Sequence, residues 1–190
     1  MNRDVQLAFA PDATYAQLVG ERATAHAGPL LGRIVLAVAI IGTSVAIAAT
    51  GRVSVALVTS VGLSWSFALL VQALAAAAII VPARGRRVTT ARAFELWFLA
   101  HVPWTLWFLV PAAVFSLAGI HFSDTVRFAA GLVPLVWTVV VLRAFARQVL
   151  GFSRVGAVAA THQLIVWGLA LCYIAFAIGG WDRVLAEIGL

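Results

Sequence analysis

Three polar side chains that can hold or exchange protons stand inside long apolar stretches of the chain: Gln72, His101 and His162. A neutral imidazole can act as an acid, a base or a metal ligand, and a side-chain amide both donates and accepts hydrogen bonds. Ionisable groups inside membrane segments usually face the bundle interior and pair with one another. We therefore treat these three residues as one candidate polar cluster.

The sequence allows two simple interpretations of the polar cluster. In the first, His101 and His162 hydrogen-bond to neighbouring helices, Gln72 included, and hold them together for about 1 kcal/mol or less per bond. In the second, the cluster belongs to a path for protons or cations, with Glu95, six residues before His101, as the acid at its mouth. Arg92 precedes Glu95 by three residues, which also fits an interfacial ion pair on one helix face.

A third interpretation is haem binding. Imidazoles from two helices, here His101 and His162, can ligate one iron axially, and aromatic residues near His101 would supply apolar walls: Trp97, Trp104 and Phe108. We predict no cofactor, with haem b as the alternative. The single cysteine, Cys172, excludes a disulfide framework or a cysteine-based metal site within one chain.

Depth argues against catalysis by a serine nucleophile. The stretch 62–66, with Ser64 at its centre, superficially suggests an intramembrane serine protease with His162 as the base. At about 1.5 Å of rise per helical residue, Ser64 and His162 are separated by about 12 Å in depth. A nucleophile and its base must come within about 3 Å, so no catalytic residue is predicted.

The elements that must position these side chains are membrane-spanning helices. Of the 190 residues, 63% are hydrophobic and only 11% are charged, and the mean hydropathy is +1.03. A soluble domain carries roughly a quarter of its residues charged. Five apolar runs approach or exceed the roughly twenty residues that cross a bilayer, at about 30–50, 53–81, 91–119, 128–146 and 156–179. Lipid offers no partner to unpaired backbone groups, so the predicted fold is an all-α, five-span transmembrane bundle.

Arginine placement predicts the orientation of this bundle. With the N-terminus inside, ten of the thirteen arginines fall on the cytoplasmic side and three fall outside, which are Arg52, Arg127 and Arg183. We therefore predict a cytoplasmic N-terminus and a C-terminus outside. The arginines form no basic patch interleaved with aromatic residues, so no nucleic-acid partner is expected despite the net charge of +6. The absence of lysine suggests a GC-rich bacterial source, hence the bacterial cytoplasmic (inner) membrane.

The same orientation places the polar cluster in one layer. With span midpoints at about 67, 105 and 167, Gln72, His101 and His162 each lie about 6–8 Å to the cytoplasmic side of the midplane.

The first 29 residues form a polar head ahead of the domain 30–190. Tyr15, Leu18 and Val19 share one helical face, which predicts a short amphipathic helix. This helix either lies in the cytoplasmic membrane interface or packs against its own bundle.

The head carries the pattern Pro-x-x-Thr-Tyr-x-x-Leu at residues 11–18, followed by a small-residue-rich first span and four more. In this pattern, span count and orientation the chain resembles the bacterial Yip1-domain membrane proteins. Eukaryotic relatives of that family contact small GTPases and carry an Asp-Leu-x-Gly-Pro signature, which this sequence lacks. The resemblance therefore implies a membrane protein without a GTPase role.

Small residues at four-residue spacing mark helix faces that can approach a neighbour closely: Ser64 and Ala68 in the second run, Gly156 and Ala160 in the fifth. Short loops leave little surface except to lipid and to other membrane proteins. The leading expectation is a non-enzymatic structural, scaffolding or accessory subunit, whose partners are lipid and either other integral membrane proteins or further copies of the chain. The alternatives are a small transporter or channel with a path at Glu95, His101, Gln72 and His162, and a haem-binding redox subunit.

Overall fold

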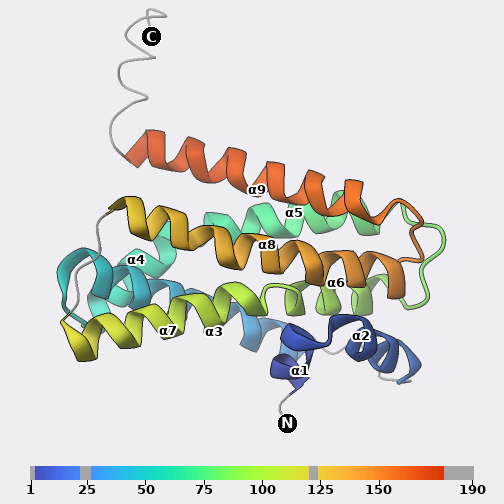
Figure 1. Ribbon diagram of the computed structural model, residues 1–190, viewed down its shortest axis with the longest axis horizontal. Helices are drawn as coiled ribbons and strands as arrows, with labels where there is room; N and C mark the ends of the chain where they lie inside the picture. The colour runs from blue at the N-terminus through green and yellow to red at the C-terminus, as the bar shows by residue number, and fades with distance from the viewer. Residues whose placement is uncertain (1–2, 22–26, 120–123, 178–190) are drawn as a thin grey trace, which may run out of the picture.

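The computed structural model describes residues 3–21, 27–119 and 124–177, and every regular element within them is an α-helix (Figure 1). The predicted all-α class is therefore confirmed for this part of the chain. Residues 178–190, whose end we expect outside the membrane, lie beyond the described residues.

Nine helices follow one another in the described ranges. They are α1 (Arg3–Phe9), α2 (Pro11–Gly20), α3 (Ala27–Thr50), α4 (Val55–Trp65), α5 (Phe67–Ile80), α6 (Thr90–Leu99), α7 (Val102–Ala118), α8 (Asp124–Gln148) and α9 (Val155–Ala177). Two of the predicted apolar runs consist of two helices each, α4 with α5 and α6 with α7, and the other three correspond to α3, α8 and α9. The head holds two short helices instead of the single one expected, and α3 begins within the predicted head.

The long helices lie side by side in a bundle, with α1 and α2 together at one end of it (Figure 1). α3 packs against α4 and α7, while α9 packs against α5 and α8. α8 contacts α2, α7 and α9, so it joins the head to the rest of the bundle.

Two stretches in the described residues are long and apolar enough to cross a membrane, Val55–Ile80 and Thr90–Val110. Two shorter apolar stretches, Leu31–Ile47 and Val155–Gly168, lie in α3 and α9. α8 carries charged residues at both ends, which lower its mean hydropathy. By length and composition the structure thus holds two candidate membrane-spanning segments.

The helical ladder is interrupted between α6 and α7. Pro103 has no N–H and cannot donate to the carbonyl group four residues earlier. Immediately before it, the N–H of Ala100 bonds to Trp97 O and the N–H of His101 bonds to Phe98 O, each three residues back instead of four. The carbonyl group of Leu96 consequently loses its regular helical partner and is open to another donor.

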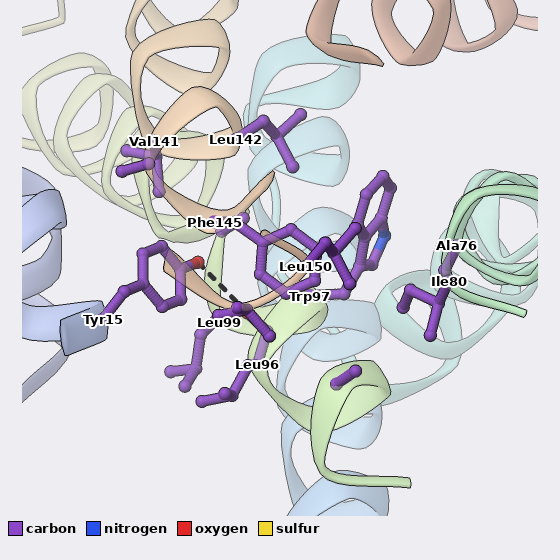
Figure 2. Packing of buried hydrophobic residues seen from close by; sticks show 14 of the residues in the cluster. Tyr15, Ala76, Ile80, Leu96, Trp97, Leu99, Val141, Leu142, Phe145 and Leu150 are labelled. Carbon is purple, nitrogen blue, oxygen red and sulfur yellow. Dashed lines mark hydrogen bonds between the residues drawn. The ribbon is translucent and has the colours of Figure 1, made fainter. Parts of the chain in front are cut away.

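The cluster of buried hydrophobic residues includes side chains of α2, α6 and α8 that pack against one another (Figure 2). Tyr15, Trp97 and Phe145 are each fully buried. The ring of Phe145 meets the rings of Tyr15 and Trp97 edge to face, with centroids 5.7 and 5.5 Å apart. Aromatic pairs at such distances and angles contribute about 0.5–1.5 kcal/mol each beyond the area they bury.

The head packs against its own bundle, which is the second of the two placements that the sequence allowed. The hydroxyl group of Tyr15 donates to the free Leu96 carbonyl at 3.1 Å, a bond drawn as a dashed line in Figure 2. The indole N–H of Trp137 on α8 donates to Ala8 O at 2.7 Å. On the exposed side, Arg147 pairs with Asp12 at 3.0 Å. Because the Tyr15 hydroxyl is buried, its pKa is raised well above the ordinary value, and the group stays a donor.

Candidate functional site

Gln72, His101 and His162 meet in the structure. Gln72 lies on α5, His162 lies on α9, and His101 lies at the break between α6 and α7. The Nε2 atom of His101 is 2.8 Å from Gln72 Oε1, and Nε2 of His162 also contacts that oxygen. The two imidazole centroids are 5.4 Å apart. His162 is 1% exposed and Gln72 is 8% exposed, so little solvent reaches the shared contact.

Trp97 forms one wall of this polar cluster. Its ring meets the ring of His162 edge to face, with centroids 4.8 Å apart, and lies 6.1 Å from the ring of His101. Since Trp97 also packs against Phe145, the cluster is directly attached to the aromatic core. The packing of α5 against α9 brings Gln72 and His162 together.

Hydrogen-bond chemistry decides which group of Gln72 the two histidines share when all three side chains are neutral. Nδ1 of His101 lies 3.2 Å from the carbonyl oxygen of Trp97, which can only accept, so this nitrogen carries the proton. Nε2 of a neutral His101 is then an acceptor, and Gln72 must donate to it. If the Gln72 amide group is rotated by half a turn, its NH₂ group lies beside both rings. Each of its two N–H groups then donates to one Nε2 atom.

One added proton would give the cluster a second hydrogen-bond pattern. When Nε2 of His101 is also protonated, the ring becomes a cation that donates from both nitrogens. Gln72 then presents its oxygen, which accepts from Nε2 of His101 and from Nε2 of His162. The two states differ by one bound proton, by a half-turn of one amide, and by the tautomer of His162, whose proton moves from Nδ1 to Nε2.

Several buried polar atoms on α6 and α9 have no hydrogen-bond partner among the described residues. They are Nδ1 of His162, Nε1 of Trp97, and both amide atoms of Gln163. Gln163 follows His162 on α9 and is 7% exposed. Sequence reasoning missed Gln163, although it stands in the same apolar run one residue beyond His162. Such atoms can bind water or a small polar ligand.

The geometry does not fit a haem held between His101 and His162. Nε2 of both rings points at one atom of Gln72, and the rings meet at 60° with centroids 5.4 Å apart. A flat macrocycle between the two nitrogens would have to replace the Gln72 side chain and separate α9 from the break. Among the described residues, no group of three or more histidine, cysteine, aspartate or glutamate side chains can hold a metal ion.

Glu95 forms an ion pair with Arg92, three residues earlier on α6, at 2.7 Å. Both side chains are nearly buried, at 13% and 10% exposed. Glu95 is six residues from His101, about 9 Å along a helix, and its carboxylate is not part of the polar cluster. It faces a separate cavity at the junction with the head.

The small residues selected from the sequence lie mostly on the outside. Ser64, Gly156 and Ala160 are exposed, and Ala68 is partly buried. The Ser64 hydroxyl donates to Ser60 O at 2.9 Å, so it is not positioned as a nucleophile for His162.

α3 and α4 approach each other closely at Gly42 and Gly62. A Cβ atom on Gly42 would overlap the carbonyl oxygen of Val58, and one on Gly62 would lie 2.9 Å from Val38 Cγ1. Sequence reasoning missed this glycine pair.

Comparisons of the chain with protein families, with curated proteins and with solved structures found no match.

Proposed function

We propose that the chain is a five-span integral protein of the bacterial cytoplasmic membrane, with its N-terminus in the cytoplasm and its C-terminus outside. The exterior of the bundle supports this placement, because large aliphatic side chains are exposed along α3, α4, α5, α8 and α9. Examples are Leu31, Val35, Val55, Leu63, Leu70, Leu74, Val136 and Leu164, each at least 60% exposed. In water such a surface would aggregate, whereas in lipid it needs no covering.

Within the membrane, the chain acts as a Yip1-like structural or accessory subunit without enzymatic activity. The observation that carries this proposal is the outer face of α9. Gly156 and Ala160 are exposed there, and no atom lies within 4 Å of a Cβ built on Gly156 or on Gly168. The chain thus leaves these small residues uncovered, while it uses Gly42 and Gly62 for its own packing.

An uncovered face of small residues suits a neighbouring helix. Helices in lipid gain little from hydrophobic burial and associate by close backbone approach, which small side chains permit. The partner is another integral membrane protein or a second copy of this chain.

Cross-linking in native membranes, followed by extraction in mild detergent, tests the proposal. Ala160→Leu enlarges the α9 face and should lower the cross-linked complex roughly tenfold, through about 1–3 kcal/mol of overpacking. Val140→Leu, at an exposed position of α8 that is 52% exposed, is the matched control and should leave the complex unchanged. A wild-type chain that stays monomeric in native membranes would overturn the accessory role.

A second candidate function is supported by the polar cluster. Its two hydrogen-bonded states differ by one proton, which is what a step in proton transfer or proton-coupled transport requires. Purified protein in liposomes with an internal pH-sensitive dye tests this function. Proton flux above that of empty liposomes, abolished by Gln72→Leu, supports it; flux equal to that of empty liposomes rejects it.

A further inference from the structure

Two loops at the same end of the bundle meet and form one surface, which we call the two-loop surface (Figure 1). They are residues 81–89, between α5 and α6, and residues 149–154, between α8 and α9. The backbone N–H of Arg87 donates to Val149 O at 3.0 Å. Gly151 has a φ of 69°, and a Cβ atom there would lie 2.9 Å from Gly85 O, so glycine is needed for the loops to approach this closely.

The two-loop surface is strongly positive. It carries four arginines and no aspartate or glutamate. Arg86 has a structural role, because its guanidinium group donates to Ile80 O at 2.6 Å and to Val81 O at 3.1 Å and so caps the C-terminal end of α5. The other three arginines are exposed, and their guanidinium groups make no hydrogen bond or ion pair with the described residues: Arg84, Arg87 and Arg154.

The neighbouring charges do not compensate these three. Asp12 of the head pairs with Arg147 of α8 at 3.0 Å, so the two charges offset each other. Arg154 directly precedes α9, and the N-terminal end of a helix is the positive end of its dipole. An anion at this point is therefore attracted both by the guanidinium group and by the helix.

The position of the two-loop surface favours a phospholipid over an acidic protein as the source of the anion. Loop 81–89 joins Val55–Ile80 to Thr90–Val110, the two stretches long and apolar enough to cross a membrane. Val81 begins this loop and is 62% exposed, and Leu74 on α5 is 61% exposed. A lipid with its acyl chains along α5 would thus have its phosphate close to the loop arginines, whose long side chains reach a headgroup while their stems stay on apolar surface.

We infer that the two-loop surface binds anionic phospholipids of the cytoplasmic leaflet through Arg84, Arg87 and Arg154. The inference rests on the proposed membrane placement, under which both loops lie at the cytoplasmic surface. Anionic headgroups of that leaflet attract basic segments next to membrane-spanning helices. The exposed guanidinium groups then have phosphate partners in the membrane that the described residues do not offer.

Native mass spectrometry of the full chain in a neutral detergent tests the inference. The probes are dioleoyl phosphatidylglycerol, dioleoyl phosphatidylcholine with the same acyl chains, and a hexaglutamate peptide. We expect phosphatidylglycerol to be retained in preference to phosphatidylcholine. Arg84→Gln, Arg87→Gln and Arg154→Gln should each lower this preference roughly fivefold, the effect of losing one cation near an anionic headgroup.

Arg52→Gln is the matched control, because it removes one exposed arginine from a loop at the other end of Val55–Ile80 and should leave the preference unchanged. Arg84→Lys keeps the charge and should also keep the preference. For the wild type, the preference should fall as the ammonium acetate concentration rises from about 0.05 to 0.5 M, because salt screens exposed charges. This measurement needs no variant to fold.

Equal retention of both lipids by the wild type overturns the inference, and so does a preference that salt leaves unchanged. Equal losses in Arg84→Gln and Arg52→Gln overturn it as well. Binding of hexaglutamate without a preference for phosphatidylglycerol would assign the surface to an acidic protein instead. Alkaline extraction of cell membranes separates these failures from that of the proposed function, because a chain released by alkali is not membrane-embedded at all.

Discussion

At the scale of single residues, the polar cluster is defined by complementary hydrogen-bonding capacity. Gln72 can bond to both histidines at once. It either donates from the two N–H bonds of its NH₂ group or accepts with the two lone pairs of its oxygen. Counting residues along each run predicted that Gln72, His101 and His162 share a depth, and the structure places them in contact. Gln163 was not predicted, because the depth of a residue in the membrane does not say which face of α9 turns toward the bundle interior.

Gln72→Leu should destabilise the protein by about 1–3 kcal/mol, because the buried His162 and the partly buried His101 lose their shared partner while the volume of the side chain is nearly kept. Gln17→Leu on the exposed face of α2 is the matched control and should be close to neutral. Chemical unfolding in detergent, followed by tryptophan fluorescence, measures both variants. Equal stability of Gln72→Leu and wild type would show that the contact contributes nothing to the fold.

Tyr15 gives a pH-dependent prediction. Its folded pKa is raised by burial, so its stabilising effect is complete below the unfolded value of about 10 and is lost as the pH rises above it. The chain has no lysine, and Tyr173 is its only other tyrosine, so few groups titrate in that range. The free energy of unfolding, measured by chemical unfolding followed by fluorescence, should therefore fall between pH 9 and pH 11.

Tyr15→Phe is the control for this titration. The variant should lose about 1–3 kcal/mol at pH 8, since Leu96 O is left without a donor, and its stability should then change little with pH. An equally steep decline in Tyr15→Phe would assign the titration to other groups.

At the scale of helices, the sequence predicted which stretches are helical better than how they are divided or joined. Apolar length identifies a run, but the break at His101 depends on Pro103 and on donors from elsewhere, such as Tyr15. The docking of the head could not be read from its amphipathic pattern, because the same apolar face suits a membrane interface and a protein core. Close approach of α3 and α4 at Gly42 and Gly62 depends on tertiary geometry, which spacing within one run does not reveal.

Gly42→Ala should cost about 1–3 kcal/mol, because the added methyl group would overlap Val58 O and force α3 and α4 apart. Gly32→Ala on the same helix is the matched control: a Cβ there has no atom within 4 Å, and alanine favours the helix. Thermal unfolding of both variants in the same detergent measures the difference. A Gly42→Ala variant as stable as Gly32→Ala would mean that the two helices do not approach this closely.

At the scale of the whole molecule, the proposed orientation places three features in one cytoplasmic half: the head, the cavity beside Glu95 at its junction with the bundle, and the polar cluster. Tyr15 bonds to the carbonyl group of Leu96 on α6, one residue before Trp97, and Trp97 forms a wall of the cluster. Arg92 and Glu95, which line the cavity at the junction with the head, lie on the same short helix. α6 therefore links three features that the sequence presents as separate.

Orientation can be tested with single cysteines introduced into a Cys172→Ser background. Arg84 and Arg52 are both exposed and lie in loops at opposite ends of the stretch Val55–Ile80. Because ten of the thirteen arginines fall inside under the proposed topology, Arg84→Cys should be protected from an impermeant thiol reagent in intact cells, and Arg52→Cys should react. Permeabilised cells, in which both cysteines should react, control for accessibility. Labelling of Arg84→Cys but not Arg52→Cys in intact cells would reverse the topology and place the head at the outer surface of the membrane.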